Sequence, residues 1–157
     1  MVLLDDNWGV KTIEKKIFIL KEKFALLSTE DRYLALIEMG RALTPYPKEL
    51  KILKYTVPGC QSTLYLFAEL NENGLLTFKV DSDALISKGL AALLIAVYTD
   101  ESPKTILETP PTFLLDLGVL TTLSPSRSNG LAHIHKRIKE EAILADGLLK
   151  TSHSTTL

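Results

Sequence analysis

Apolar residues recur at helical spacing in the first third of the chain. Steps of four, three, four and three separate five of them, which places them on one stripe of a helix: Ile13, Ile17, Leu20, Phe24 and Leu27. Ser28 then offers a hydroxyl with an acid, Asp31, three residues later, which is typical of a helix start. Prolines at 45 and 47 end this second segment, because proline removes a backbone donor. The pattern predicts two N-terminal helices.

The middle of the chain changes to a pattern of strands. Residues 63–70 and 75–80 are rich in aromatic and branched side chains, and the turn sequence Asn-Glu-Asn-Gly at 71–74 joins them. An Asn-Gly step favours a hairpin turn. A further piece at 51–57 has the composition of a strand, so we expect a small antiparallel sheet of about three strands.

Helical patterns return after the sheet. We expect a helix at 83–98, capped by Asp81 or Ser82, with Gly89 allowing close packing on the sheet. Short helices are expected after Ser102-Pro103 and at 112–117, followed by a turn-rich connector at 124–130 and a last helix with one apolar face. Helices, then strands, then helices indicate an α+β fold. We expect one domain over 1–147 and a flexible tail over 148–157.

Composition and charge narrow the function. The formal charge of −1 over 157 residues provides no basic stripe, which argues against a nucleic-acid partner. The longest apolar run, 90–98, is far shorter than the ~20 residues that span a bilayer, so we expect no membrane association. Acidic residues at 5 and 6 stand where a signal peptide requires basic ones, which predicts a cytoplasmic protein.

Cys60 is the only cysteine, so it can form no internal disulfide and cannot by itself hold zinc or an iron–sulfur cluster. Pro58 and Gly59 come directly before it, and a predicted strand follows. A proline-glycine pair favours a turn, which would present the thiol on a loop that a partner can approach closely. A loop thiolate can attack the outer sulfur of a persulfide. The alternative, an inert thiol in the core, stays open on residue type alone.

Other side chains are weaker candidates. Gln61 and Ser62 can either hydrogen-bond around the sulfur or brace the turn. Lys51 and Lys54 are closer to ordinary solvated charges than to groups that lower the thiol pKa. His133 and His135 face different sides of a helix, so at most one can face Cys60, and we expect a solvated histidine. Helix capping accounts for the acids at 81 and 83 without a metal.

Four stretches together resemble the SufE family of cysteine desulfuration proteins. They read GCQS at 59–62, DRY with LIEMGR at 31–33 and 36–41, SDA with KGL at 82–84 and 88–90, and SPSRSNGL at 124–131. The resemblance runs in order from about residue 12 to 146. Tyr65 stands where family members often have tryptophan, which keeps an aromatic strand residue. The resemblance implies the fold that SufE proteins share with the NifU type.

This resemblance also implies a function. Cys60 matches the residue that accepts sulfane sulfur as a persulfide from a cysteine desulfurase of the SufS or CsdA type, and Gly59, Gln61 and Ser62 complete that motif. Pyridoxal phosphate would belong to the desulfurase, and this chain would need no cofactor or metal of its own. The sulfur would pass to an iron–sulfur scaffold such as the SufBCD complex. Arg127, in the matched 124–131 stretch, would either pin its loop or pair with a carboxylate at the docking surface.

Two other function classes remain open. A scaffold on which clusters are assembled is suggested by the same order of elements, although one cysteine argues against it. A thiol hydrolase would use Cys60 with a histidine as base, although no convincing triad is apparent. The sulfur carrier is the leading hypothesis, as an acceptor and activator of the desulfurase rather than a stand-alone enzyme.

Overall fold

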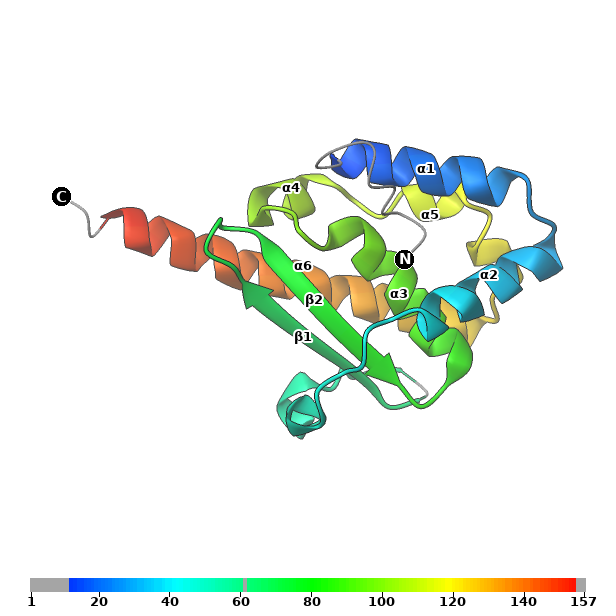
Figure 1. Cartoon of the computed structure of the whole chain (residues 1–157), viewed down its shortest axis with the longest axis horizontal. Coiled ribbons are helices and arrows are strands. Elements are labelled where there is room, and N and C mark those ends of the chain that lie inside the picture. The colour runs from blue at the N-terminus through cyan, green and yellow to red at the C-terminus, as the bar shows by residue number, and fades with distance from the viewer. Residues whose placement is uncertain (1–11, 61, 155–157) are drawn as a thin grey trace.

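The computed structural model describes residues 12–60 and 62–154, and in these ranges it combines helices with one small sheet (Figure 1). The helices are α1 (Ile13–Ala25), α2 (Thr29–Arg41), α3 (Leu85–Tyr98), α4 (Pro103–Glu108), α5 (Phe113–Asp116) and α6 (Pro125–Ser154); the strands are β1 (Leu64–Leu70) and β2 (Leu76–Ser82). Three 3-10 turns lie at Lys48–Leu50, Leu53–Tyr55 and Leu120–Thr122. The predicted α+β fold, with helices at both ends of the chain, is confirmed.

Helix α3 forms the centre of the core. Every residue from Gly89 to Tyr98 is buried, as expected of a helix that is apolar on all sides. It packs against α1, α2, α6 and β2. Gly89 faces α2 rather than the sheet, because a methyl group there would overlap the carbonyl of Leu36. Neither α3 nor any other helix in the two described ranges is long and apolar enough to cross a bilayer.

The sheet consists of one antiparallel hairpin. Leu66 lies opposite Val80, and both are buried against the helices. The Asn71 side chain accepts hydrogen bonds from the backbone N–H groups of Asn73 and Leu75, which closes the predicted turn. Gly74 follows with a positive φ of 75°, a conformation that glycine adopts without steric cost.

The expectation of a third strand at 51–57 is wrong. Residues Leu53–Tyr55 form a 3-10 turn, and the backbone of this segment pairs with β1 through one isolated bridge, between Thr56 and Tyr65, rather than as a strand. The composition of residues 51–57 resembles that of a strand because the apolar side chains of this segment pack against other parts of the chain. Tyr55, for example, packs edge-on against the ring of Phe67 at a centroid distance of 5.1 Å.

Helix starts agree with the sequence in two cases and differ in two. Ser28 and Ser102 accept the expected capping hydrogen bonds at α2 and α4. Helix α3, however, begins after Ala84 without a side-chain cap, so neither Asp81 nor Ser82 caps it.

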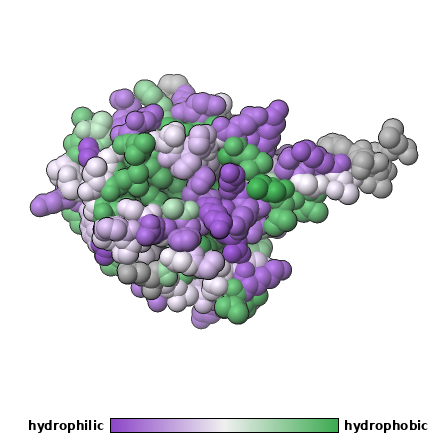
Figure 2. All heavy atoms as spheres, turned by 180° about the vertical axis from the view of Figure 1, so that it is seen from behind, coloured by the Kyte–Doolittle hydropathy of each residue, from purple (hydrophilic) through white to green (hydrophobic). Residues whose placement is uncertain are grey.

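The connector expected at 124–130 is instead the first turns of α6, which begins at Pro125. Proline is well suited to this position, because the first N–H groups of a helix lack helical partners. At its other end α6 extends beyond the body of the molecule (Figures 1 and 2). Its exposed apolar residues there include Ile143, Leu144 and Leu148. Helical structure reaches Ser154, and the expected flexibility of the tail from 148 stays a prediction.

Candidate functional site

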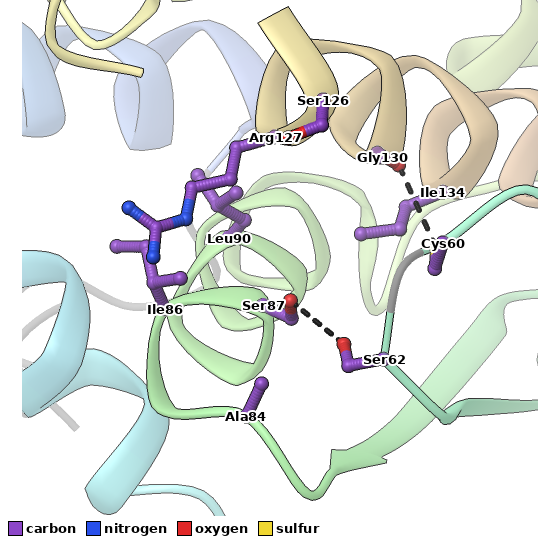
Figure 3. A pocket seen from close by; sticks show the side chains of 10 residues that line it. All are labelled: Cys60, Ser62, Ala84, Ile86, Ser87, Leu90, Ser126, Arg127, Gly130 and Ile134. Atoms are coloured by element: carbon purple, nitrogen blue, oxygen red, sulfur yellow. Dashed lines mark hydrogen bonds between the residues drawn. The ribbon is translucent and has the colours of Figure 1, made fainter. Parts of the chain in front are cut away.

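A pocket of about 210 Å³ opens beside Cys60, between the loop before β1, the start of α3 and the start of α6 (Figure 3). Its lining combines polar and apolar side chains from these three segments: Cys60 and Ser62; Ala84, Ile86, Ser87 and Leu90; and Ser126, Arg127, Gly130 and Ile134. Three stretches far apart in the sequence therefore converge on the only cysteine.

The backbone before Cys60 has the turn geometry expected from the sequence. Val57 donates a hydrogen bond of 2.8 Å to the Leu64 carbonyl, which fixes the base of the loop. Gly59 has a φ of 87°, where side chains other than glycine's are strained. The space beside it is filled by the ring of His133, since a Cβ at Gly59 would lie 2.5 Å from that ring. The glycine thus admits a histidine of the same chain, where we expected an approaching partner.

The Cys60 thiol is half-buried, with its Sγ 4.0 Å from the carbonyl oxygen of Gly130, a weak hydrogen bond. Burial raises the pKa of this thiol above its ordinary value. The resting molecule therefore keeps Cys60 mainly protonated at neutral pH, and the thiol is less nucleophilic than a free cysteine. It is neither sealed in the core nor fully exposed.

Ser62 braces the loop. Its hydroxyl donates a hydrogen bond of 2.9 Å to Ser87 Oγ on α3 and lies 3.4 Å from Ser82 Oγ at the end of β2. Ser82 in turn donates to the carbonyl of Thr63. Of the two roles considered for Ser62, the described contacts fit bracing. Gln61, the other candidate in this motif, lies outside the described residues.

Arg127 lies across the pocket from Cys60, with its side chain passing Leu90 toward Ile86 (Figure 3). Its guanidinium carbon is 5.8 Å from the centroid of the Tyr33 ring, which is a cation–π contact. Residue 127 is therefore held on the first turn of α6 as one wall of the pocket, opposite the thiol.

One face of α6 holds the cysteine loop, and sequence reasoning missed this. Gly130, His133 and Arg137 follow at steps of three and four, so they share a helix face. Arg137 donates hydrogen bonds of 3.1 and 3.0 Å to the carbonyls of Thr56 and Lys54, and it pairs with Glu141 at 3.2 Å. The spacing is visible in the sequence, but nothing in the sequence indicates which segment lies against it.

The two histidines do not form a base for the thiol. His133 packs on Gly59, whereas His135 packs on Tyr98, with the two ring centroids 5.6 Å apart. Burial lowers the pKa of His135, with the charge of Lys139 adding to the effect. His133 is exposed, as expected for a solvated histidine, whereas His135 is a packed side chain.

Asp81 has a role that helix capping did not predict. It pairs with Lys51 at 2.9 Å and with Lys88 at 3.3 Å, which ties the segment before the cysteine loop to α3. Burial alone would raise the pKa of Asp81, but hydrogen bonds from Lys51, the Ser82 N–H and Lys88 outweigh it and lower the pKa. The other lysine near Cys60 in the sequence, Lys54, has its Nζ 5.4 Å from the centroid of the Tyr55 ring.

Within residues 12–60 and 62–154, no group of three or more histidine, cysteine or acidic side chains is placed to hold a metal ion. The described chemistry of the pocket consists of one thiol, one guanidinium, several hydroxyls and an apolar floor. A thiol facing a small pocket can form and shelter a covalent sulfur adduct.

Comparison with known proteins adds independent information. The SufE family model, described as an Fe-S metabolism associated domain, matches residues 19–142. An uncharacterized SufE-like protein of Synechocystis is 40% identical over 112 residues, covering 71% of this chain and 70% of that protein. An uncharacterized SufE-like protein of Rhizobium etli is 37% identical over 117 residues, covering 72% of this chain and 79% of that protein.

Two further comparisons extend to a larger protein and to a solved fold. SufE-like protein 1, chloroplastic/mitochondrial, of Arabidopsis thaliana is 35% identical over 112 residues, which cover 71% of this chain but only 30% of that protein. The solution structure of a hypothetical protein from Thermus thermophilus superposes with a TM-score of 0.70 and 26% identity. That match covers 83% of this chain and 95% of the other.

Proposed function

The chain belongs to the SufE family, whose domain is associated with iron–sulfur metabolism, and on that premise we propose that it is a sulfur carrier. Cys60 accepts a sulfane sulfur as a persulfide from a protein donor and passes it on for iron–sulfur cluster assembly. The observation that carries the proposal is the position of Cys60, half-buried on a braced loop at the edge of a pocket.

The transfer requires no resident cofactor. The Cys60 thiolate attacks the outer sulfur of the donor persulfide, a new S–S bond forms at Cys60, and the donor's S–S bond breaks. The electron pair leaves with the donor's cysteine thiolate. Nothing is oxidised or reduced overall, because the sulfane sulfur keeps its oxidation state during the exchange.

The pocket supports the acceptor role in two ways. It offers space next to Sγ for one more sulfur atom, walled by Ile134 and Leu90. Burial there shields a persulfide from reductants and oxidants in solvent. The bracing by Ser62 and Arg137 fixes where the sulfur is held.

The proposed donor is a cysteine desulfurase of the SufS or CsdA type, which carries the pyridoxal phosphate itself. By removing the persulfide from the desulfurase, Cys60 stimulates its turnover. Leu85, which lies in sequence between the pocket residues Ala84 and Ile86, is exposed and offers an apolar contact for the desulfurase. The downstream recipient is a scaffold such as the SufBCD complex, and the proposed compartment is the cytoplasm.

The other two function classes have less support. A cluster scaffold needs several ligands, and the described residues offer Cys60 without a set of metal-ligating neighbours. A hydrolase needs a base on the thiol, whereas the hydrogen-bond partner of Sγ in the described part of the chain is the Gly130 carbonyl.

Intact-protein mass spectrometry tests the proposal. The chain is incubated with cysteine and an active desulfurase from the same source, and the mass is measured before and after treatment with a reductant. We expect the addition of one sulfur that the reductant removes, and no addition to Cys60→Ser. An unmodified native chain beside a desulfurase that turns over would refute the partnership.

A further inference from the structure

The two ends of the pocket carry different chemistry. Cys60 stands at one side of the pocket and Arg127 at the other, with Ile86 and Leu90 close to the Arg127 side chain (Figure 3). A protein-borne persulfide needs only the thiol end. The positive charge across the pocket is therefore unexplained by sulfur exchange between two cysteines.

Arg127 has donors to offer a ligand. Its guanidinium carbon lies 5.8 Å from the Tyr33 ring centroid, and a cation–π contact of this kind does not use the N–H groups as hydrogen-bond donors to a carboxylate or carbonyl. Within residues 12–60 and 62–154, no carboxylate pairs with Arg127 and no acceptor receives a hydrogen bond from its side chain. Two other arginines differ in this respect: Arg137 is paired with Glu141 and Arg41 with Glu38.

We propose that this pocket also accepts sulfur directly from a small anionic donor, without a desulfurase. The donor's anionic end, a carboxylate or a sulfonate-type group, binds Arg127, and its transferable sulfane sulfur lies at Cys60. This inference rests on the proposed role of Cys60 as a sulfur acceptor. Thiosulfate and cysteine persulfide both have this chemistry, since each joins a sulfane sulfur to an anionic group.

The size and lining of the pocket fit such a donor. A volume of about 210 Å³ exceeds the ~30 Å³ that one water occupies in the liquid, which leaves room for a ligand of several heavy atoms. Ile86 and Leu90 add apolar surface to the lining, which lowers the local polarity and strengthens the attraction between a guanidinium and an anion. A guanidinium binds planar anionic oxygens with two parallel hydrogen bonds.

The reaction balances without an oxidant. Cys60 first loses its proton to solvent, and its thiolate attacks the sulfane sulfur of the donor. A Cys60 S–S bond forms while the donor's own S–S or S–SO₃ bond breaks. The electron pair leaves on sulfite when the donor is thiosulfate, and on the cysteine thiolate when it is cysteine persulfide.

Loading of the chain alone by defined small donors tests this inference. Mass spectrometry follows the addition of one sulfur against donor concentration for thiosulfate, cysteine persulfide and the methyl ester of cysteine persulfide, which lacks the carboxylate. We expect saturable loading by the two anionic donors. Sulfate, an anion without sulfane sulfur, should compete with thiosulfate.

The variants separate binding by charge from a structural effect. Arg127→Gln should raise the half-saturating concentration of both anionic donors by about tenfold or more, since it removes charged hydrogen bonds. It should leave loading by the methyl ester nearly unchanged, and Arg127→Lys should give intermediate values. Arg41→Gln removes an exposed, paired arginine and is the matched control, with unchanged loading expected.

The outcomes distinguish this inference from the proposed function. Loading that never saturates, or that is equal in the native chain and Arg127→Gln, would overturn the small-donor site even if a desulfurase loads Cys60. If thiosulfate loads the chain and cysteine persulfide does not, Arg127 accepts a sulfonate-type group rather than a carboxylate. Saturable loading by the small donors, together with no loading of Cys60 by an active desulfurase, would refute the proposed partner and support the small-donor site.

Discussion

Replacement of Gly59 by alanine should loosen the cysteine loop. Alanine at a φ of 87° costs about 1–2 kcal/mol, because its Cβ is crowded by the backbone in the left-handed region. The new Cβ would also lie 2.5 Å from the His133 ring. His133 is exposed, so its ring can turn aside, and the backbone strain should account for most of the cost.

The single cysteine makes this prediction measurable by its reactivity. A loop destabilised by about 1.4 kcal/mol populates open conformations about tenfold more. Reaction of Gly59→Ala with an aromatic disulfide reagent should therefore be up to about tenfold faster than that of the native chain. Gly147→Ala is the control, since nothing lies within 4 Å of its added Cβ and alanine favours a helix.

A double-mutant cycle with His133→Ala assigns the cause. If backbone strain dominates, the cost of Gly59→Ala should be the same in the His133→Ala background within about 0.5 kcal/mol, measured by urea unfolding. If Gly59→Ala costs no stability in that background, then contact with His133, and not the positive φ, is the cause of the destabilisation. Native reactivity and native stability of Gly59→Ala would refute the reasoning as a whole.

Three further predictions follow from contacts around the core and the site. Gly89→Ala should destabilise the chain by about 2 kcal/mol in urea unfolding, because its Cβ would overlap the Leu36 carbonyl; an unchanged midpoint would contradict this packing. Arg137→Met should lower the free energy of unfolding by about 1–2 kcal/mol and speed reaction of Cys60, since the carbonyl of Thr56 loses its donor; unchanged reactivity would show that Arg137 does not hold the loop. Alkylation of Cys60 by iodoacetamide should rise with pH through a midpoint above that of the urea-unfolded chain, because burial raises the folded pKa; any stability from this thiol is present below the unfolded pKa and is lost as pH rises through the folded one. A midpoint at or below that of the unfolded chain would contradict the burial of the thiol.

Local sequence signals predicted the helices well where the deciding interaction is local. Ser28 and Ser102 cap their helices because a hydroxyl and the N–H it accepts from are three residues apart. The Asn-Gly turn closes through the side chain of Asn71 for the same reason. Where the contacts are distant, the same reasoning failed: Asp81 pairs with Lys51 and Lys88 instead of capping a helix.

The sequence by itself determined that one thiol, preceded by a proline-glycine turn and followed by a strand, is the reactive candidate, and it determined the family through motifs in order along the chain. Only the tertiary structure decided what surrounds that thiol. The pocket joins segments up to more than sixty residues apart, because α6 crosses the cysteine loop and brings the Gly130 carbonyl to Cys60 and Arg127 to the opposite wall. No spacing along the chain encodes such a contact, since it depends on how the helices pack around α3.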